Sequence, residues 1–231
     1  MTTATATPAT TTWNIDPAHS SADYKVKHMM ISNVKGSFSG LSGVLTEHAS
    51  DSTLSSIVAS IPVATISTGD PQRDGHLKSA DFFDAEKYPT LDFKSTTVVR
   101  TGDAYEVTGD LTIHGVTKPV TFAVDGPSAP GKDPWGNTRI GLSATAKINR
   151  KDFGLGWNAA LETGGFLVGE DIAITLDVEF IKAAQLVWIA SREGAAGWPL
   201  CALGNYLLQR IFPSRIEYLY VPGGPPCHSE L

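Results

Sequence analysis

Cysteine is scarce in this chain. Only Cys201 and Cys227 occur among its 231 residues, and both lie near the C-terminus. Two thiols placed so late supply neither a disulfide framework nor a cysteine-based zinc cluster for the residues that precede them. The sequence therefore predicts a main fold that depends on neither, which is compatible with a reducing cytoplasm.

Long apolar runs and clusters of basic residues are missing as well. No uninterrupted apolar stretch reaches the ~18 residues that a membrane-spanning helix needs. The net charge is −6 and the Lys and Arg residues are scattered, which argues against binding to nucleic acid or to an anionic membrane. The first residues lack the basic and apolar regions of a secretory signal. We expect a soluble, cytoplasmic protein with no transmembrane segment and no nucleic-acid partner.

The common catalytic motifs are also missing. The sequence has no Gly-x-Ser-x-Gly elbow, no His-Glu-x-x-His zinc motif and no phosphate-binding Gly-x-x-x-x-Gly-Lys loop. Asp74 and His76 alone are too few ligands for a metal ion. His19, His28 and His114 lie in different predicted elements, without a close pair. The sequence predicts neither an enzyme nor a metal or cofactor site.

What the sequence does contain is strand periodicity. Apolar and polar residues alternate with a period of two, the pattern of antiparallel strands with one wet face, in 20–28, 54–66, 90–100, 105–113, 120–124, 139–149 and 172–180. His114–Pro119 is predicted as a hairpin turn. Seven to nine such strands fit a sandwich or a closed barrel. Several are longer than the usual ~5–6 residues, and small residues in the inward rows leave space, so we favour an all-β antiparallel barrel with a hollow interior.

One passage, residues 67–89, is strongly helical. Asp70 and Pro71 form a helix-start signal, and Pro89 is predicted to end the segment. Its polar end contains Arg73, Asp74 and His76, and its apolar flank contains Phe82, Phe83 and Tyr88. A short helical insert of this kind suits a lid over a cavity. The polar end has three interpretations: a catalytic set, a contact with a ligand headgroup, or structural pairing at the helix start.

A second polar and aromatic group follows the strand that ends near Asn149. Arg150, Phe153 and Trp157 are spaced by Gly154 and Gly156. This segment is either a ligand contact or a tight corner in which the glycines permit unusual backbone angles.

The composition changes abruptly after Ala184. Residues 185–231 contain no Lys and no Asp, and include a Pro/Gly-rich run at 221–226. The alternatives are a partner-binding extension, a membrane-surface anchor, an ordered extension packed on the barrel, and non-native residues encoded by a vector or by frame-shifted read-through. We favour the last, because the segment follows a natural strand end and matches no folding pattern. The predicted organisation is a disordered leader at 1–11, a barrel at 12–184 and this tail, whose removal should leave barrel stability unchanged.

Several ordered motifs together resemble the YceI family of lipid-binding proteins over residues 12–183. They are Trp13–Ser20 with His28, Val34–Phe38, Arg73–Leu77, Asp81–Asp84 with Tyr88–Pro89, Gly109–Val120 and Arg150–Gly154. The resemblance implies a lipocalin-like, extended antiparallel β-barrel whose apolar tunnel holds a long isoprenoid chain of the quinone or polyprenyl phosphate type. It also implies that no reaction is firmly attached to the fold.

The resulting hypothesis is non-catalytic binding, sequestration or transport of an isoprenoid or other long-chain lipid, by a monomer or a homodimer. Family members are often exported, whereas we expect a cytoplasmic protein. The alternatives are an interaction module that recruits partners through the tail, and an enzyme with His76 or His28 as base and Arg73 or Arg150 as anion holder. The residues predicted to contact the ligand are Tyr24, Val26, His28, Phe38, Ile61, Arg73, His76, Phe82, Phe83, Phe93, Leu111, Leu142, Arg150, Phe153, Trp157 and Ile174.

Overall fold

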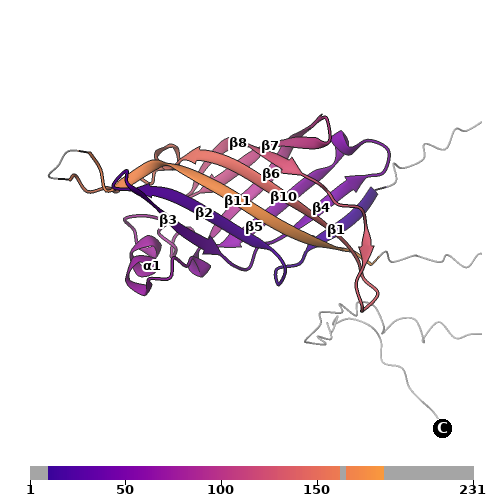
Figure 1. The fold of residues 1–231 in the computed structure, drawn as a ribbon, viewed down its shortest axis with the longest axis horizontal. Helices are drawn as coiled ribbons and strands as arrows, with labels where there is room; N and C mark the ends of the chain where they lie inside the picture. Colours follow the sequence, from indigo (N-terminus) through magenta and orange to yellow (C-terminus); the bar gives the residue numbers. More distant parts are fainter. Residues whose placement is uncertain (1–9, 162–164, 185–231) are drawn as a thin grey trace, which may run out of the picture. The chain divides into compact units, whose positions relative to one another are not determined.

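The computed structural model describes residues 10–161 and 165–184, and most of their regular secondary structure is strand (Figure 1). The strands are β1 Thr10–Ile15, β2 Ser21–His28, β3 Ser32–Phe38, β4 Ser42–His48, β5 Ser56–Pro62, β6 Thr90–Thr101, β7 Ala104–Ile113, β8 Val116–Asp125, β9 Gly131–Lys132, β10 Thr138–Asn149 and β11 Val168–Lys182. The helices are α1, Pro71–Lys78, and three 3-10 turns: η1 Ser52–Leu54, η2 Val63–Thr65 and η3 Arg150–Phe153. None of the helices in the described ranges is long and apolar enough to cross a membrane.

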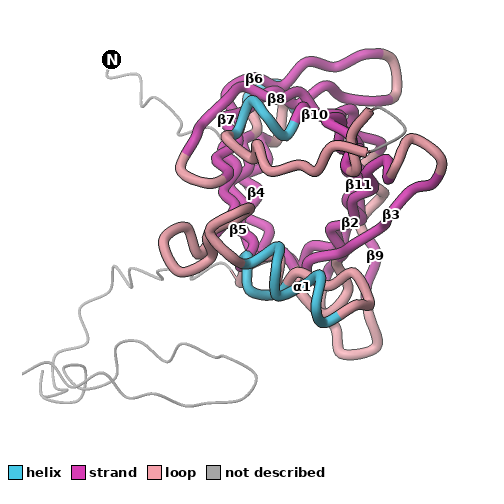
Figure 2. The backbone as a smooth tube through the Cα atoms, turned by 90° about the vertical axis from the view of Figure 1, so that its left-hand side faces the viewer, coloured by secondary structure: helices cyan, strands magenta, loops and turns pink. Residues whose placement is uncertain are grey.

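Eight of the strands close into an antiparallel barrel, which confirms the predicted fold class. The hydrogen-bonded order is β11-β1-β4-β5-β6-β7-β8-β10, and β10 pairs back with β11. The β10–β11 ladder runs from Arg139 opposite Ile181 to Asn149 opposite Asp171. Figure 2 shows this ring of strands from one end. Because the sheet closes on itself, the backbone groups of these strands are paired around the whole circuit.

β2 and β3 extend the sheet beside the first two-thirds of β11. β1 pairs with β11 only from Ile15 to Trp13, opposite Phe180 to Lys182, whereas β2 pairs with residues Val168–Asp177. The outer edge of β3 is joined by two backbone hydrogen bonds of 2.8 and 2.9 Å between Ser37 and Ser67. Residues 63–89, which include α1, therefore continue the wall of the barrel at this edge, and α1 lies at its rim (Figure 2).

The predicted helical passage is wrong in its extent. α1 ends at Lys78, because the Ser79 hydroxyl and backbone N–H both bond to the carbonyl oxygen of His76. Residues 79–89 form turns instead, and Asp84 has a positive φ of 47°. These turns reverse the chain, and as a result Phe82 and Phe83 pack inward.

Two other boundaries differ from the expectations. The reversal between β7 and β8 uses only His114 and Gly115, with φ of 53° and 72°, so β8 begins at Val116 and not after Pro119. Two residues with positive φ form the tight turn that matches strand twist. β1 begins at Thr10, so residues 10 and 11 belong to a strand and not to the leader. Residues 1–9 and 185–231 lie outside the described residues, so the predictions about the leader and the tail stay predictions.

Candidate functional site

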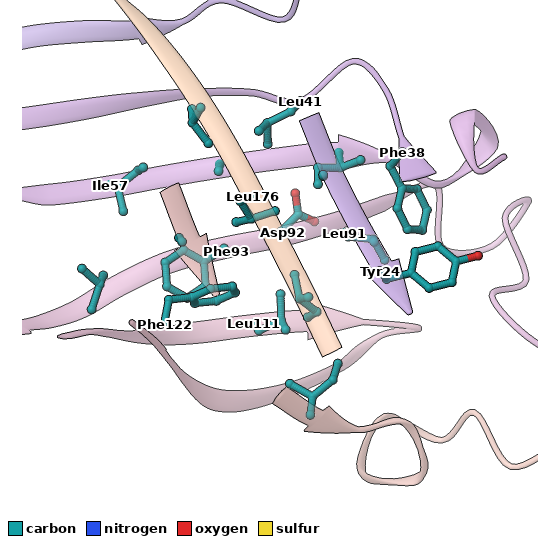
Figure 3. A pocket seen from close by; sticks show the side chains of 18 of the residues that line it. Tyr24, Phe38, Leu41, Ile57, Leu91, Asp92, Phe93, Leu111, Phe122 and Leu176 are labelled. Carbon is teal, nitrogen blue, oxygen red and sulfur yellow. The ribbon is translucent and has the colours of Figure 1, made fainter. Parts of the chain in front are cut away.

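The barrel encloses an elongated cavity of about 320 Å³. Its wall consists almost entirely of the inward-facing side chains of the strands, joined by residues from α1 and η3 (Figure 3). Small-molecule sites have volumes of roughly 300–1,000 Å³ and are mostly apolar. The cavity therefore has the size and the chemistry of a site for an apolar ligand.

The inward rows predicted from strand alternation do form this wall. Twelve of the predicted contact residues line the cavity: Tyr24, Val26, Phe38, Ile61, Phe82, Phe83, Phe93, Leu111, Leu142, Arg150, Phe153 and Ile174. The expectation of a hollow barrel is confirmed, because these side chains surround a cavity and do not meet across a filled core. Their contact with a ligand stays a prediction.

Glycines allow two aromatic rings to lie flat against the wall. A Cβ atom on Gly109 would come within 2.5 Å of the Phe93 ring, and one on Gly36 would come within 2.4 Å of the Tyr24 hydroxyl. Phe93 in turn packs edge-on against Phe122, with centroids 5.2 Å apart, and Tyr24 packs at a tilt of 44° against Phe38, with centroids 5.7 Å apart. These aromatic pairs hold the shape of the cavity without filling it.

The segment around α1 contributes one side of the wall. Leu77 at the end of the helix and Phe82 and Phe83 in the following turns all line the cavity. The Phe83 N–H donates to the Leu77 carbonyl at 3.0 Å, which fixes the turn that directs these side chains inward. The predicted apolar flank is thus part of the cavity, although its aromatic residues follow the helix.

Four predicted contact residues do not lie in the cavity wall. His76 lies within 3.1 Å of the Asp81 carboxylate, on the surface, and its ring packs edge-on against Trp157 with a centroid distance of 4.8 Å. The Trp157 ring also packs against the Phe82 ring, with a centroid distance of 5.1 Å. His28 is the last residue of β2. His76 and Trp157 thus pack against each other outside the cavity wall, and His28 lies at a strand end.

Arg73 is the fourth of these residues and has a structural role. Its Nε donates to the Thr68 hydroxyl at 2.8 Å and its Nη2 donates to the Thr68 carbonyl at 3.1 Å. The Thr68 hydroxyl and backbone N–H both donate to Asp74 Oδ1. The polar end of the helical passage therefore ties α1 to the preceding loop, as in the structural interpretation given above.

Two polar groups in the wall have unusual surroundings. The Tyr24 hydroxyl is buried without a hydrogen-bond partner among the described residues, and so is Nη2 of Arg150. Burial raises the pKa of Tyr24 to about 12, and the Asp74 carboxylate acts in the same direction. Burial also lowers the pKa of Arg150. Of the pairs in the enzyme alternative, the structure thus places only Arg150 in the wall, and neither His28 nor His76 lies there with it.

The sequence reasoning missed part of the wall. Leu41 precedes β4 and Leu45 lies within it, and both line the cavity. β4 has seven residues, and Leu45 is its only large apolar side chain that faces inward. The alternation of apolar and polar residues in this strand is therefore weak. Polar residues in and around the end of β4 and η1 also line the cavity: Glu47, Ser52, Ser55 and Ser56.

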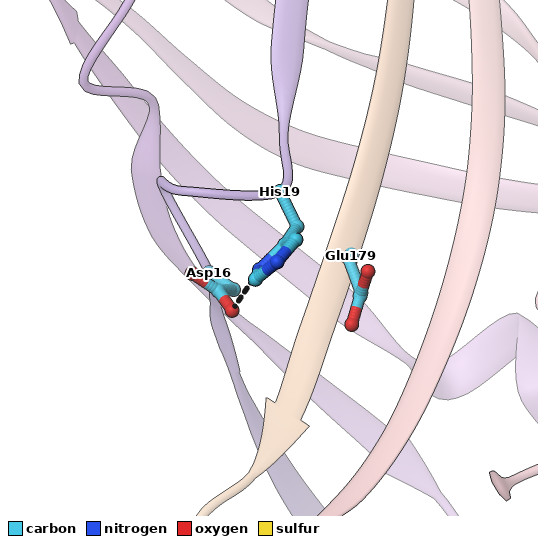
Figure 4. A group of neighbouring side chains, drawn as sticks. All are labelled: Asp16, His19 and Glu179. Atoms are coloured by element: carbon cyan, nitrogen blue, oxygen red, sulfur yellow. Dashed lines mark hydrogen bonds and ion pairs between the residues drawn. The ribbon is translucent and has the colours of Figure 1, made fainter. Parts of the chain in front are cut away.

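A separate cluster of titratable groups lies outside the cavity. One ligand atom from each of Asp16, His19 and Glu179 lies within 4.8 Å of the others (Figure 4). Arg139 Nη1 donates to both carboxylates at 2.6 Å, and His19 Nδ1 lies 2.8 Å from Asp16. Burial alone would raise the pKa of Asp16, but the hydrogen bonds from Arg139, His19 and the Ala18 N–H lower it. The arginine supplies the positive charge of this cluster, so we interpret it as an ion-pair network that joins strands.

Comparison with known proteins gives a consistent result. A family model described as a YceI-like domain matches residues 13–180. A UPF0312 protein of Staphylococcus aureus is 36% identical over 171 residues, which cover 74% of this chain and 97% of that protein.

Solved structures share the fold. Burkholderia cenocepacia BcnA superposes with a TM-score of 0.61 at 25% identity, covering 71% of this chain and 98% of that chain. A polyisoprenoid binding domain from Saccharophagus degradans, implicated in plant cell wall breakdown, gives a TM-score of 0.53 at 14% identity and covers 77% of this chain and 100% of that chain. At this low identity the second likeness concerns the fold alone.

Proposed function

The chain belongs to the YceI-like family, and on this premise we propose that it binds a long-chain lipid of the isoprenoid class inside its barrel without catalysing a reaction. The observation that carries the proposal is the elongated apolar cavity of about 320 Å³. A protein of the same fold is described as a polyisoprenoid binding domain, which supports this class of ligand.

The energetics of such a cavity favour a chain over a compact ligand. Each CH₂ group removed from water contributes about 0.8 kcal/mol. A long chain therefore gains affinity in proportion to the length that enters the barrel, whichever headgroup it has. A carrier or a sequestering protein needs this property, and it needs no reacting group beside the ligand. We propose sequestration or transport in the cytoplasm as the role, which cell fractionation with detection of the protein would test.

The first test is to identify what the protein holds. Mass spectrometry of an organic extract from the purified protein should detect a co-purified isoprenoid or other long-chain lipid. The same extract from protein unfolded and refolded in lipid-free buffer is the control. An extract without lipid, together with a protein that takes up no added chain, would contradict the proposal.

The second test uses a larger side chain on β5 to narrow the cavity. Ala59 lines the cavity, whereas its neighbour Val58 points outward and is 52% exposed. Ala59→Trp should displace part of the chain and weaken binding by about tenfold, because losing two buried CH₂ groups costs roughly 1.5 kcal/mol. Val58→Trp is the matched control and should bind as the wild type does. Binding is measured by displacement of a fluorescent polyene, and equal affinities for the two variants would place the ligand elsewhere.

A further inference from the structure

We propose that Arg150 binds an anionic headgroup, a phosphate or a carboxylate, on the lipid that occupies the cavity. This inference rests on the proposed function and makes it more specific, because it names the chemistry of the polar end of the ligand. It separates acidic lipids from neutral ones, among them the quinones.

Arg150 is a charged residue with almost no access to solvent. Only 3% of its surface is exposed, and it lines the cavity. Its Nε donates to the Gly169 carbonyl at 2.9 Å, and its Nη1 donates to the Leu155 carbonyl at 2.5 Å. Nη2 has no acceptor among the described residues. Two sides of the guanidinium are thus held in place, while the third keeps its N–H groups free.

The charge of Arg150 is not balanced by a direct partner. Both of its acceptors are neutral carbonyls, and it forms no ion pair within the described residues. The nearest acid that acts on it is Glu170, whose carboxylate is already paired with Lys151 and accepts from Asn149. A guanidinium stays protonated in proteins, and a buried charge without a counter-ion is costly. An incoming anion would remove this cost.

The position of Arg150 fits a headgroup site. It directly follows the last residue of β10, where η3 begins, and bonds to Gly169 near the start of β11. It therefore lies at one end of the longest strand ladder, β10–β11, and the apolar wall extends along the barrel from there. A lipid with its headgroup at Arg150 can place its chain against that wall. Charge-assisted bonds to an anion are roughly twice as strong as bonds to a neutral acceptor, which favours an acid over a quinone carbonyl.

The test compares ligands that differ only in the headgroup. Wild-type protein is titrated with geranylgeranyl phosphate and geranylgeraniol, and with hexadecanoate and hexadecanol, at a pH at which the acids are ionised. A hydrogen bond to a charged group contributes about 1.5–3 kcal/mol, so an acid should bind about tenfold or more tightly than its alcohol. A preference in only one of the pairs identifies the site as one for phosphate or for carboxylate.

A pair of variants assigns the preference to the residue. Arg150→Met should lose the preference and bind acid and alcohol with similar affinity. Lys147→Met removes the same charge from an exposed side chain that is paired with Asp171, and it should keep the preference. Should Arg150→Met not fold, Arg150→Lys keeps the charge but not the planar fork of donors, and it should bind the acids more weakly than the wild type while binding the alcohols equally well.

The outcomes separate this inference from the proposed function. Equal affinity of the wild type for acids and alcohols overturns the inference and leaves lipid binding intact. A preference that persists in Arg150→Met also overturns it. Failure to bind any of the four chains contradicts the proposed function itself.

Discussion

Tyr24 shows how a single residue can serve a cavity at the expense of stability. Its ring packs against Gly36 and Phe38, with ring centroids of Tyr24 and Phe38 5.7 Å apart. Its hydroxyl is buried without a hydrogen-bond partner in the described part of the chain. Leaving such a group unsatisfied costs about 1–3 kcal/mol. In Figure 3 this hydroxyl points away from the labelled apolar side chains.

Tyr24→Phe should therefore stabilise the lipid-free protein by about 1 kcal/mol, because the ring is kept and the unsatisfied hydroxyl is removed. Urea unfolding at pH 7 measures the change. A loss of stability would show that the hydroxyl has a partner in solution.

The same residue predicts a pH dependence. The pKa of Tyr24 is about 12 in the folded protein, against an ordinary value of 10.0. The unfolded chain loses this proton first, so the stability that depends on the neutral hydroxyl is complete below pH 10 and is lost as the pH rises to about 12. The difference in stability between wild type and Tyr24→Phe should shift further toward the variant over this range.

At the scale of an element, α1 and the turns after it have separate tasks. Asp70 caps the helix by accepting from the N–H groups of Gln72 and Arg73, and Pro71 occupies the first turn. The helix buries none of its own residues. The apolar contacts come mainly from Phe82 and Phe83, which the turns direct into the wall. The helix therefore positions this segment, and the turns supply most of its apolar surface in the cavity wall.

Phe83→Asp should abolish retention of co-purified lipid, because it places a charge against the apolar cavity. His76→Ala removes a surface pair with Asp81, worth about 0–1 kcal/mol, and should retain most of the lipid. Lipid is quantified by mass spectrometry.

Circular dichroism of both variants controls for unfolding, since simple destabilisation of Phe83→Asp would also release lipid. Turnover of a lipid ester that disappears in His76→Ala while lipid binding persists would support the enzyme alternative.

At the scale of the whole barrel, Arg139 joins segments far apart in the sequence. Its guanidinium bonds to Asp16 after β1, to Asp133 before β10 and to Glu179 in β11, at 2.6–2.7 Å. These carboxylates raise the pKa of Arg139. The network lies where β1 and β10 both meet β11, so it ties the seam that closes the barrel.

This network predicts acid sensitivity. Burial would raise the pKa of Asp133, but hydrogen bonds from Arg139, Asn137 and the Trp135 N–H lower it from 3.8 to about 2. The stabilisation is complete above the unfolded value and is lost as the pH falls from about 4 through 2. Asp133→Asn should be less stable than wild type at pH 7 and should lose less stability over this acid range.

Thermal unfolding between pH 7 and pH 2 measures the difference. Asp103→Asn, an exposed change in the turn between β6 and β7, is the matched control and should follow the wild type. A parallel acid response of Asp133→Asn and wild type would mean that the seam does not depend on this carboxylate.

The sequence by itself determined most of the long strands and their inward rows, although not β1, β3 or β4. Alternation is a local property, because successive side chains of a strand point to opposite faces. The row of Tyr24 and Val26, like that of Leu91 and Phe93, could therefore be assigned to the cavity before any pairing was known. The motif resemblance supported the closed barrel and implied a class of ligand, which stays a proposal.

Only the tertiary structure decided which polar residues face the cavity. His76 and Arg150 both lie in polar and aromatic groups, but His76 meets Asp81 at the surface, whereas Arg150 is buried against the Gly169 carbonyl, 19 residues away. It also decided that Arg139 meets Asp16 across 123 residues. The burial of a polar side chain depends on the partners that the closed barrel brings to it, and a local pattern contains no information about contacts between segments so distant in the chain.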